Sequence, residues 1–130
     1  MARTYHVEVD GAEYRGTTAP AKEQAEALHM AIRTGVVANL RGAPSDMTLV
    51  AMMGAVSYED VQRFAKLLVA GRIVRDADGV EVAENLFQDQ IQNWYLLIGY
   101  ALRENVGPFW QLQRRDESPK APEPSPSTDT

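Results

Sequence analysis

The side chains that could perform catalysis are few in this chain of 130 residues, and their spacing does not group them. Cysteine is absent, which excludes a thiol nucleophile, a thiolate metal site and a disulfide framework. His6 stands on the polar face of an alternating segment and His29 lies in a helical pattern, each without a partner at the spacing of a ligand or a base. We therefore expect both histidines to be surface or boundary side chains.

The acidic residues offer two further candidate sites, and both have a simpler explanation. Residues 76–79 (Asp-Ala-Asp-Gly) resemble part of a calcium loop, but alignment on the glycine places Val74 and Asn85 at ligand positions, so a polar hairpin turn is favoured. Glu84 and Asp89 could be paired carboxylates, but nothing restrains them, which favours a solvated face. Because common catalytic and nucleotide-binding motifs are also missing, we expect no enzyme activity, metal or cofactor.

Basic residues do not form a nucleic-acid surface. The net charge is −5, and the clusters Arg72/Arg75 and Arg114-Arg115 are small and lack interleaved aromatic residues. A helix-turn-helix around residues 56–58 would have a second helix with only two basic residues, Arg63 and Lys66. Binding to nucleic acid is therefore not expected.

Composition places the chain among small globular domains, with 45% hydrophobic and 24% charged residues. The longest apolar run, residues 94–102, is too short to cross a bilayer, and the N-terminal residues lack the apolar core of a secretory signal. We expect a cytoplasmic protein with one globular domain, residues 1–115. Residues 116–130 are rich in proline and serine, acidic, and hold nothing apolar larger than Ala121, which predicts a disordered tail.

Alternation of apolar and polar residues predicts two β-hairpins. The first has Asp10-Gly11 as a two-residue turn, which pairs Val9 with Ala12 and Val7 with Tyr14. The second covers residues 72–83. A two-residue turn at Asp78-Gly79 would pair Arg75 with Val82, whereas a four-residue loop over 76–79 pairs Ile73 with Val82 and is preferred.

Helices are expected between the two hairpins. Thr18 or Ala19 could cap a first helix with Pro20 in its first turn, Leu28 and Ile32 on its apolar face, and Gly35 as a possible end. Whether residues 36–40 continue this helix is open. After a loop at 41–46, the apolar run 47–56 favours a helix, and Ser57 with Asp60 resembles a capping box for a third.

A last helix follows the second hairpin. Asn85 with Gln88 at its third position predicts the start, and a left-handed Gly107 followed by Pro108 predicts the end. Its broad apolar face consists of Phe87, Ile91, Trp94, Tyr95, Ile98 and Leu102. The sequence therefore predicts an α+β fold, a mainly helical small domain with an N-terminal hairpin and a short second hairpin, in the order ββ-α-α-α-ββ-α.

This arrangement resembles the tail assembly chaperones of long-tailed (siphovirus-type) bacteriophages and prophages. The resemblance rests on the N-terminal hairpin, the joint at residues 55–61 (Ala-Val-Ser-Tyr-Glu-Asp-Val), the second hairpin and the closing helix. This helix has an aromatic residue near its start and paired aromatic residues at its middle, and an asparagine shortly before a final aromatic pair. It covers roughly residues 5–110 and leaves out the polar tail.

The resemblance implies a role without catalysis. Such chaperones bind the long helical tape measure protein, keep it soluble, help to recruit tail tube subunits and leave before the virion is complete. Many are also made in a longer, frameshifted form. The alternative that the sequence leaves open is a small adaptor or transcriptional regulator that dimerises through its last helix.

Four aromatic residues are the candidate partner-binding residues: Trp94, Tyr95, Phe109 and Trp110. Aromatic residues at helical spacing are more often core than interface. Neighbours on a helix diverge by about 100°, so Trp94 and Tyr95 cannot both point at one narrow contact. For the pair after Pro108, we expect one ring to fold back near Leu102 and the other to lie closer to solvent.

Overall fold

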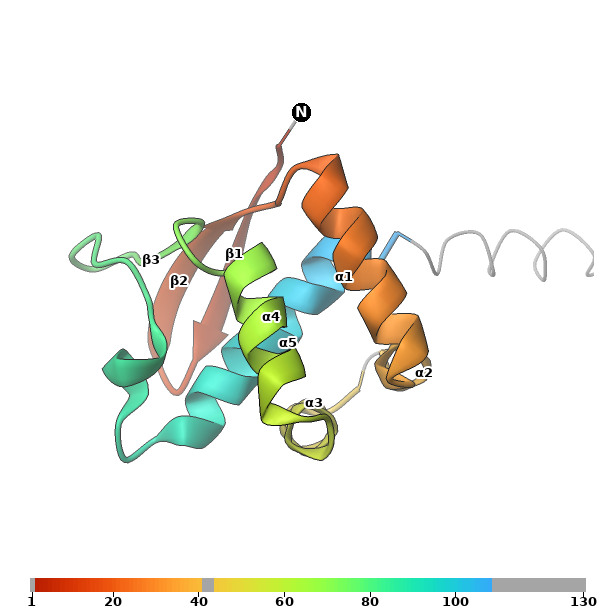
Figure 1. The fold of residues 1–130 in the computed structure, drawn as a ribbon. Helices are drawn as coiled ribbons and strands as arrows, with labels where there is room; N and C mark the ends of the chain where they lie inside the picture. Colours follow the sequence, from red (N-terminus) through yellow and green to blue (C-terminus); the bar gives the residue numbers. More distant parts are fainter. Residues whose placement is uncertain (1, 41–43, 109–130) are drawn as a thin grey trace, which may run out of the picture.

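In the computed structural model, residues 2–40 and 44–108 are described, and they form one α+β unit (Figure 1). The expected fold class is confirmed. The elements are β1 (Thr4–Val9), β2 (Ala12–Thr17), α1 (Ala21–Arg33), α2 (Val36–Asn39), α3 (Asp46–Ala55), α4 (Tyr58–Leu68), β3 (Ile73–Arg75), a 3₁₀ helix η1 (Glu84–Phe87) and α5 (Ile91–Val106).

The first hairpin forms in the predicted register, with Val9 opposite Ala12 and Val7 opposite Tyr14. Asp10 and Gly11 have φ values of 52° and 82°, the left-handed pair that a tight two-residue hairpin turn requires. Val9 and Tyr14 are buried, so the alternation turns one face of the hairpin towards the core.

The second hairpin forms only in part. The preferred four-residue loop is confirmed, because Val82 N–H donates to the Ile73 carbonyl (3.1 Å) and Arg75 N–H to that of Val80 (2.8 Å). However, the returning segment is a single bridge at Glu81 and not a strand. β3 instead pairs with β2, giving one three-stranded antiparallel sheet in the order β1-β2-β3.

Two predictions about α1 are wrong. The helix begins after Pro20, which is itself the N-cap, and the Thr18 hydroxyl accepts a hydrogen bond from Arg3 N (2.8 Å). The buried face consists of Ala27, Met30 and Ala31, whereas Leu28 is half-buried and Ile32 is 52% exposed. Gly35, at φ 81°, separates α1 from the short α2, which answers the open question about residues 36–40.

The start and end of α5 also differ from the prediction. Residues 84–87 form the 3₁₀ helix, and Asp89 is left-handed at φ 69°, so Asn85 cannot cap one continuous helix and α5 begins at Ile91. At the other end Gly107 is right-handed (φ −53°), and its N–H donates to the Arg103 carbonyl. By contrast, the Ser57 cap of α4 is confirmed, since its hydroxyl accepts from Asp60 N at 3.1 Å.

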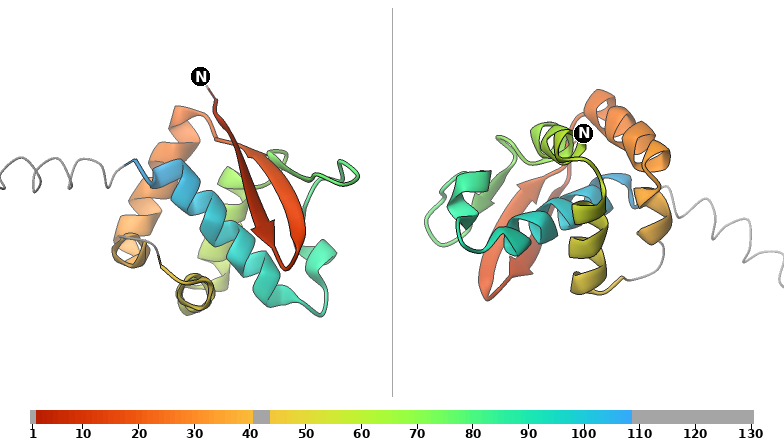
Figure 2. Two further views of the ribbon diagram at one scale, coloured as in Figure 1. Left: turned by 180° about the vertical axis from the view of Figure 1, so that it is seen from behind. Right: turned by 60° about the horizontal axis from the view of Figure 1, so that its bottom comes forward.

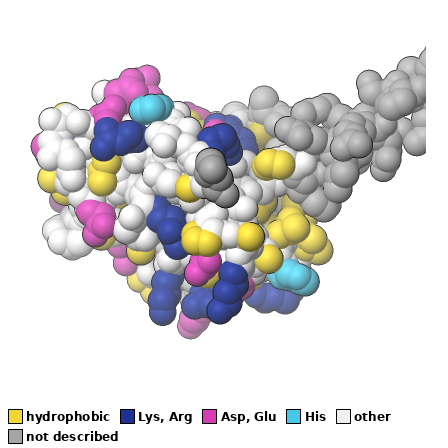
Figure 3. Space-filling model, turned by 90° about the horizontal axis from the view of Figure 1, so that it is seen from above, with side chains coloured by type: hydrophobic (Ala, Val, Ile, Leu, Met, Phe, Trp, Pro, Cys, Tyr) yellow, Lys and Arg dark blue, Asp and Glu magenta, His cyan; other side chains and the backbone are white. Residues whose placement is uncertain are grey.

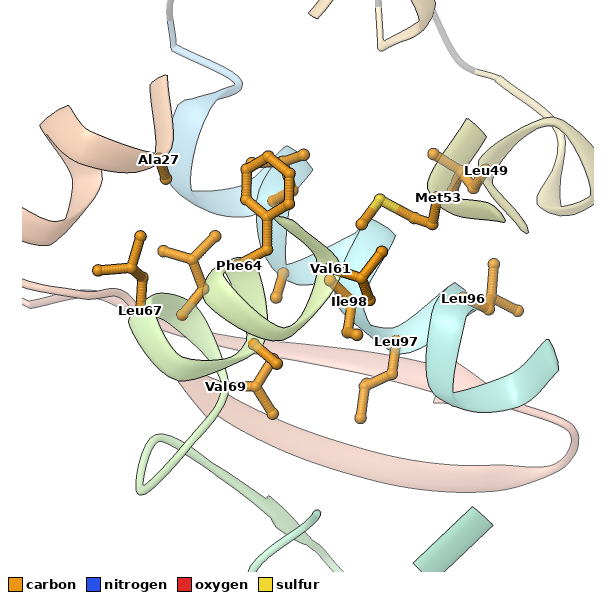
Figure 4. Packing of buried hydrophobic residues seen from close by; sticks show 14 of the residues in the cluster. Ala27, Leu49, Met53, Val61, Phe64, Leu67, Val69, Leu96, Leu97 and Ile98 are labelled. Atoms are coloured by element: carbon orange, nitrogen blue, oxygen red, sulfur yellow. The ribbon is translucent and has the colours of Figure 1, made fainter. Parts of the chain in front are cut away.

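α5 is the centre of the fold. The hairpin lies against one side of it, and α1, α3 and α4 contact the others (Figures 1 and 2). Figure 4 shows Val61 of α4, Met53 of α3 and Ile98 of α5 close together in the core. The expected apolar face is only partly correct, because Ile91 is 45% exposed and Phe87 belongs to η1, while the buried surface of α5 extends further around the helix. Buried residues of α5 are Trp94, Leu96, Leu97, Ile98, Gly99, Ala101, Leu102, Asn105 and Val106.

No helix within residues 2–40 and 44–108 combines the length and apolar character needed to cross a membrane.

Candidate partner-binding surface

Trp94 is a core residue at the edge of a pocket. Its side chain is 3% exposed, and its ring centroid lies 5.7 Å from that of Phe87, which in turn lies 6.2 Å from Tyr14. The indole Nε1 is buried without a hydrogen-bond partner among the described residues. The first role of Trp94 is therefore to join η1 and the sheet to α5.

The pocket beside Trp94 has a volume of about 230 Å³ and lies between α4 and the segment before η1. α4 supplies Gln62, Ala65 and Lys66, and the other wall includes Val82 and Ala83. Because its lining is largely apolar and it is open to solvent, it could accept one apolar side chain of a partner.

Tyr95 is half-buried and points to a different side of α5 from Trp94, as expected for neighbours on a helix. Ile91, one turn earlier on the same face, is 45% exposed. Tyr58 at the start of α4 is 56% exposed. We call Tyr58, Ile91 and Tyr95 the α4–α5 patch.

Tyr58 of this patch is held in place by a hydrogen bond. The Tyr58 hydroxyl donates to the carboxylate of Glu84 at 3.1–3.2 Å, and Gln62 Nε2 donates to the same carboxylate at 3.2 Å. This hydrogen bond to Glu84 raises the pKa of Tyr58, and smaller contributions come from desolvation and from the charges of Glu84 and Tyr95.

Phe109 and Trp110 lie outside the described residues, as do the expected domain boundary at residue 115 and the tail 116–130. The predicted contact of one ring with Leu102 involves these residues too. Leu102 itself is fully buried.

The two aspartates of the loop 76–79 form ion pairs within the fold. Asp76 pairs with Arg15 (2.8 Å) and Asp78 with Arg75 (2.7 Å), and the bond from Arg75 lowers the pKa of Asp78. The loop 76–79 is thus the polar hairpin turn that was favoured. His6 and His29 are exposed, as expected. Within residues 2–40 and 44–108, no group of three His, Cys, Asp or Glu side chains could hold a metal ion.

The basic cluster Arg72/Arg75 is also used within the fold. Arg72 Nε donates to the Leu67 carbonyl at 3.1 Å, and Arg75 holds Asp78. Arg114-Arg115 lies outside the described residues.

Sequence reasoning missed a second apolar surface, on α1. Ala21, Ala25 and Leu28 line a groove of about 410 Å³ whose other wall is Val106 and Pro108 at the end of α5. Figure 3 shows hydrophobic side chains gathered over this side of the molecule. The signal was the spacing of Ala21, Ala25 and Leu28 on one helical face, which was missed because Leu28 was grouped with Ile32 instead.

Asn105 was interpreted as part of a helix end, but it is a buried bridge. It is 5% exposed, and its Oδ1 accepts from Ala19 N (2.8 Å) and Gln24 Nε2 (3.2 Å) while its Nδ2 donates to the Ala101 carbonyl (2.8 Å). This amide therefore holds the β2–α1 connection against the end of α5.

Comparison of the chain with models of protein families, with curated proteins and with solved structures finds no match.

Proposed function

We propose that this protein is a non-enzymatic tail assembly chaperone of a long-tailed phage or prophage, which binds helical segments of the tape measure protein and helps to recruit tail tube subunits. The resemblance of residues 5–110 to that family supports the proposal. The structural observation that supports it best is the apolar pocket at Trp94, because the exposed Tyr58 donates a hydrogen bond to Glu84 in the wall of that pocket.

An amphipathic client helix presents apolar side chains every three or four residues along one face. One such side chain could enter the pocket at Trp94, while another contacts the exposed side chain of Tyr58 or Ile91. A single contact of this size is weak. Many copies of the chaperone on one elongated client would retain it through avidity.

The alternative, an adaptor or regulator that dimerises through its last helix, finds less support. α5 is surrounded by the sheet and by α1, α3 and α4, and among its large apolar side chains only Ile91 is exposed, so this helix offers little apolar surface for a dimer contact. Stable interfaces generally bury about 800 Å² from each partner, more than two side chains supply.

Co-expression with overlapping tape measure fragments tests the proposal. We expect at least one fragment to move from the insoluble to the soluble fraction and to co-purify with the chaperone. Ile91→Lys should abolish both effects, because it places a charge in the α4–α5 patch. Met47→Lys is the matched control, since Met47 is 75% exposed on α3, away from this patch.

Two results would count against the proposal. One is unchanged solubility of every fragment without co-purification. The other is equal loss of binding in the Met47 and Ile91 variants, which would remove the patch as the client surface. Self-association of the purified protein that Ile91→Lys abolishes, without client binding, would favour the dimeric adaptor.

A further inference from the structure

The groove between α1 and the end of α5 has no role in the proposed function. Ala21, Ala25 and Leu28 follow one another at spacings of four and three residues, so they form one continuous apolar strip on α1. Leu28 is half-buried and the two alanines are exposed. Two small side chains beside a larger one leave a concave strip into which rings from another segment can fit.

The position of the groove in the chain indicates what fills it. Pro108, the last described residue, is itself part of the groove wall. The next four residues are Phe109, Trp110, Gln111 and Leu112, and beyond them the sequence has no aromatic residue and no Val, Ile, Leu or Met. All the large apolar side chains of residues 109–130 therefore follow directly from the edge of the groove.

Length also fits. Four extended residues span about 13 Å, and the strip from Ala21 to Leu28 covers eight residues of helix, with a rise of about 10 Å from the first to the last. Residues 109–112 can therefore reach the whole strip without moving α5.

We propose that Phe109, Trp110 and Leu112 dock in the groove formed by Ala21, Ala25, Leu28, Val106 and Pro108 of the same chain. An aromatic side chain buries about 150–250 Å² when it is packed, so docking removes a large apolar area from water. This places the rings against α1 rather than near Leu102, which is already enclosed. The proposal concerns the chain alone and holds or fails independently of any tape measure client.

Paramagnetic labelling can test the contact directly, because the chain has no cysteine and only two tryptophans. A nitroxide attached to Ala25→Cys in ¹⁵N-labelled full-length protein should remove most of the intensity of the Trp110 indole signal, and reduction of the label should restore it. Trp110→Phe assigns that signal. The control label is Ala77→Cys, in the turn after β3 on the other side of the molecule (Figure 1), and it should leave the signal intact.

Matched variants on α1 separate the groove from the helix as a whole. Leu28→Lys should abolish the loss of intensity, whereas Ile32→Lys, on the same helix but outside the groove, should retain it. An unchanged signal of the buried Trp94 indole shows that each variant is folded. Equal intensity of the Trp110 signal with both labels would overturn the proposal. So would loss that appears only between chains when labelled and ¹⁵N-enriched molecules are mixed, because the occupant would then be a second copy.

Discussion

Replacement of Asn105 by alanine should destabilise the fold more than its size suggests. The side chain makes three hydrogen bonds, and the one from Ala19 N is buried. Without Asn105 this N–H loses its acceptor in a place that water does not reach, which costs about 1–3 kcal/mol. The Ala101 carbonyl loses less, because it also accepts the helical bond of α5.

The loss is measurable by urea denaturation. With a slope of about 2 kcal/mol per molar urea, a loss of about 2 kcal/mol lowers the midpoint by about 1 M. Hydrogen exchange of the Ala19 amide should accelerate by the same free energy. Asn93→Ala is the control on the same helix, since the two side-chain bonds of Asn93 are both long, at 3.4 Å.

A second variant distinguishes hydrogen bonding from packing. Asn105→Asp keeps the size and the acceptor for Ala19 N, but it loses the donor to the Ala101 carbonyl and places a negative charge near the C-terminal end of α5. Its defect should shrink as pH falls and the introduced carboxyl group binds a proton. A midpoint for Asn105→Ala equal to that of the wild type would refute the reasoning.

Three further predictions concern other contacts. Gly16→Ala should lower the free energy of unfolding by about 1–3 kcal/mol in thermal or urea denaturation, because the added Cβ would lie 2.7 Å from the buried Tyr5 hydroxyl oxygen. Gly54→Ala is the control, since a Cβ at Gly54 meets open space and should not destabilise the fold. The pKa of Tyr100 is raised to about 12, mainly by burial of its hydroxyl group and, second, by its hydrogen bond to Asp46. The stability gained is complete below about pH 10 and is lost as pH rises towards 12; Tyr100→Phe should remove this alkaline step. Truncation after Arg115 should change stability by less than about 0.5 kcal/mol in the same assay.

Local signals in the sequence predicted the local structure. Asp10-Gly11 determined both the turn and the register of the first hairpin, since only this register puts Val9 and Tyr14 on one face. Ser57 predicted the start of α4, because its hydroxyl and the Asp60 N–H lie within one helical turn. Each of these features depends on residues within a few positions of one another.

Tertiary packing decided the features that were missed. The pairing of β3 with β2 joins Ile73 to Gly16, far apart in the sequence, and no local pattern encodes it. On α1, hydrophobicity favoured Leu28 and Ile32 as the inner face, yet Ala27 and Ala31 are inside. Small side chains let α1 approach its neighbours closely, so Leu28 is left at the groove and Ile32 is left exposed.

The difference between buried and exposed side chains also determines which substitution can test client binding. Trp94 and Tyr95 are adjacent, but Trp94 is enclosed by Phe87 while Tyr95 lies at the edge of the core. Trp94→Ala should cost about 3–5 kcal/mol, a large part of the roughly 5–15 kcal/mol that stabilises a small domain. Loss of client binding in that variant would therefore reflect unfolding as much as a missing contact. Ile91, exposed and one turn before Tyr95, can change without opening the core, so it is the residue whose substitution isolates binding.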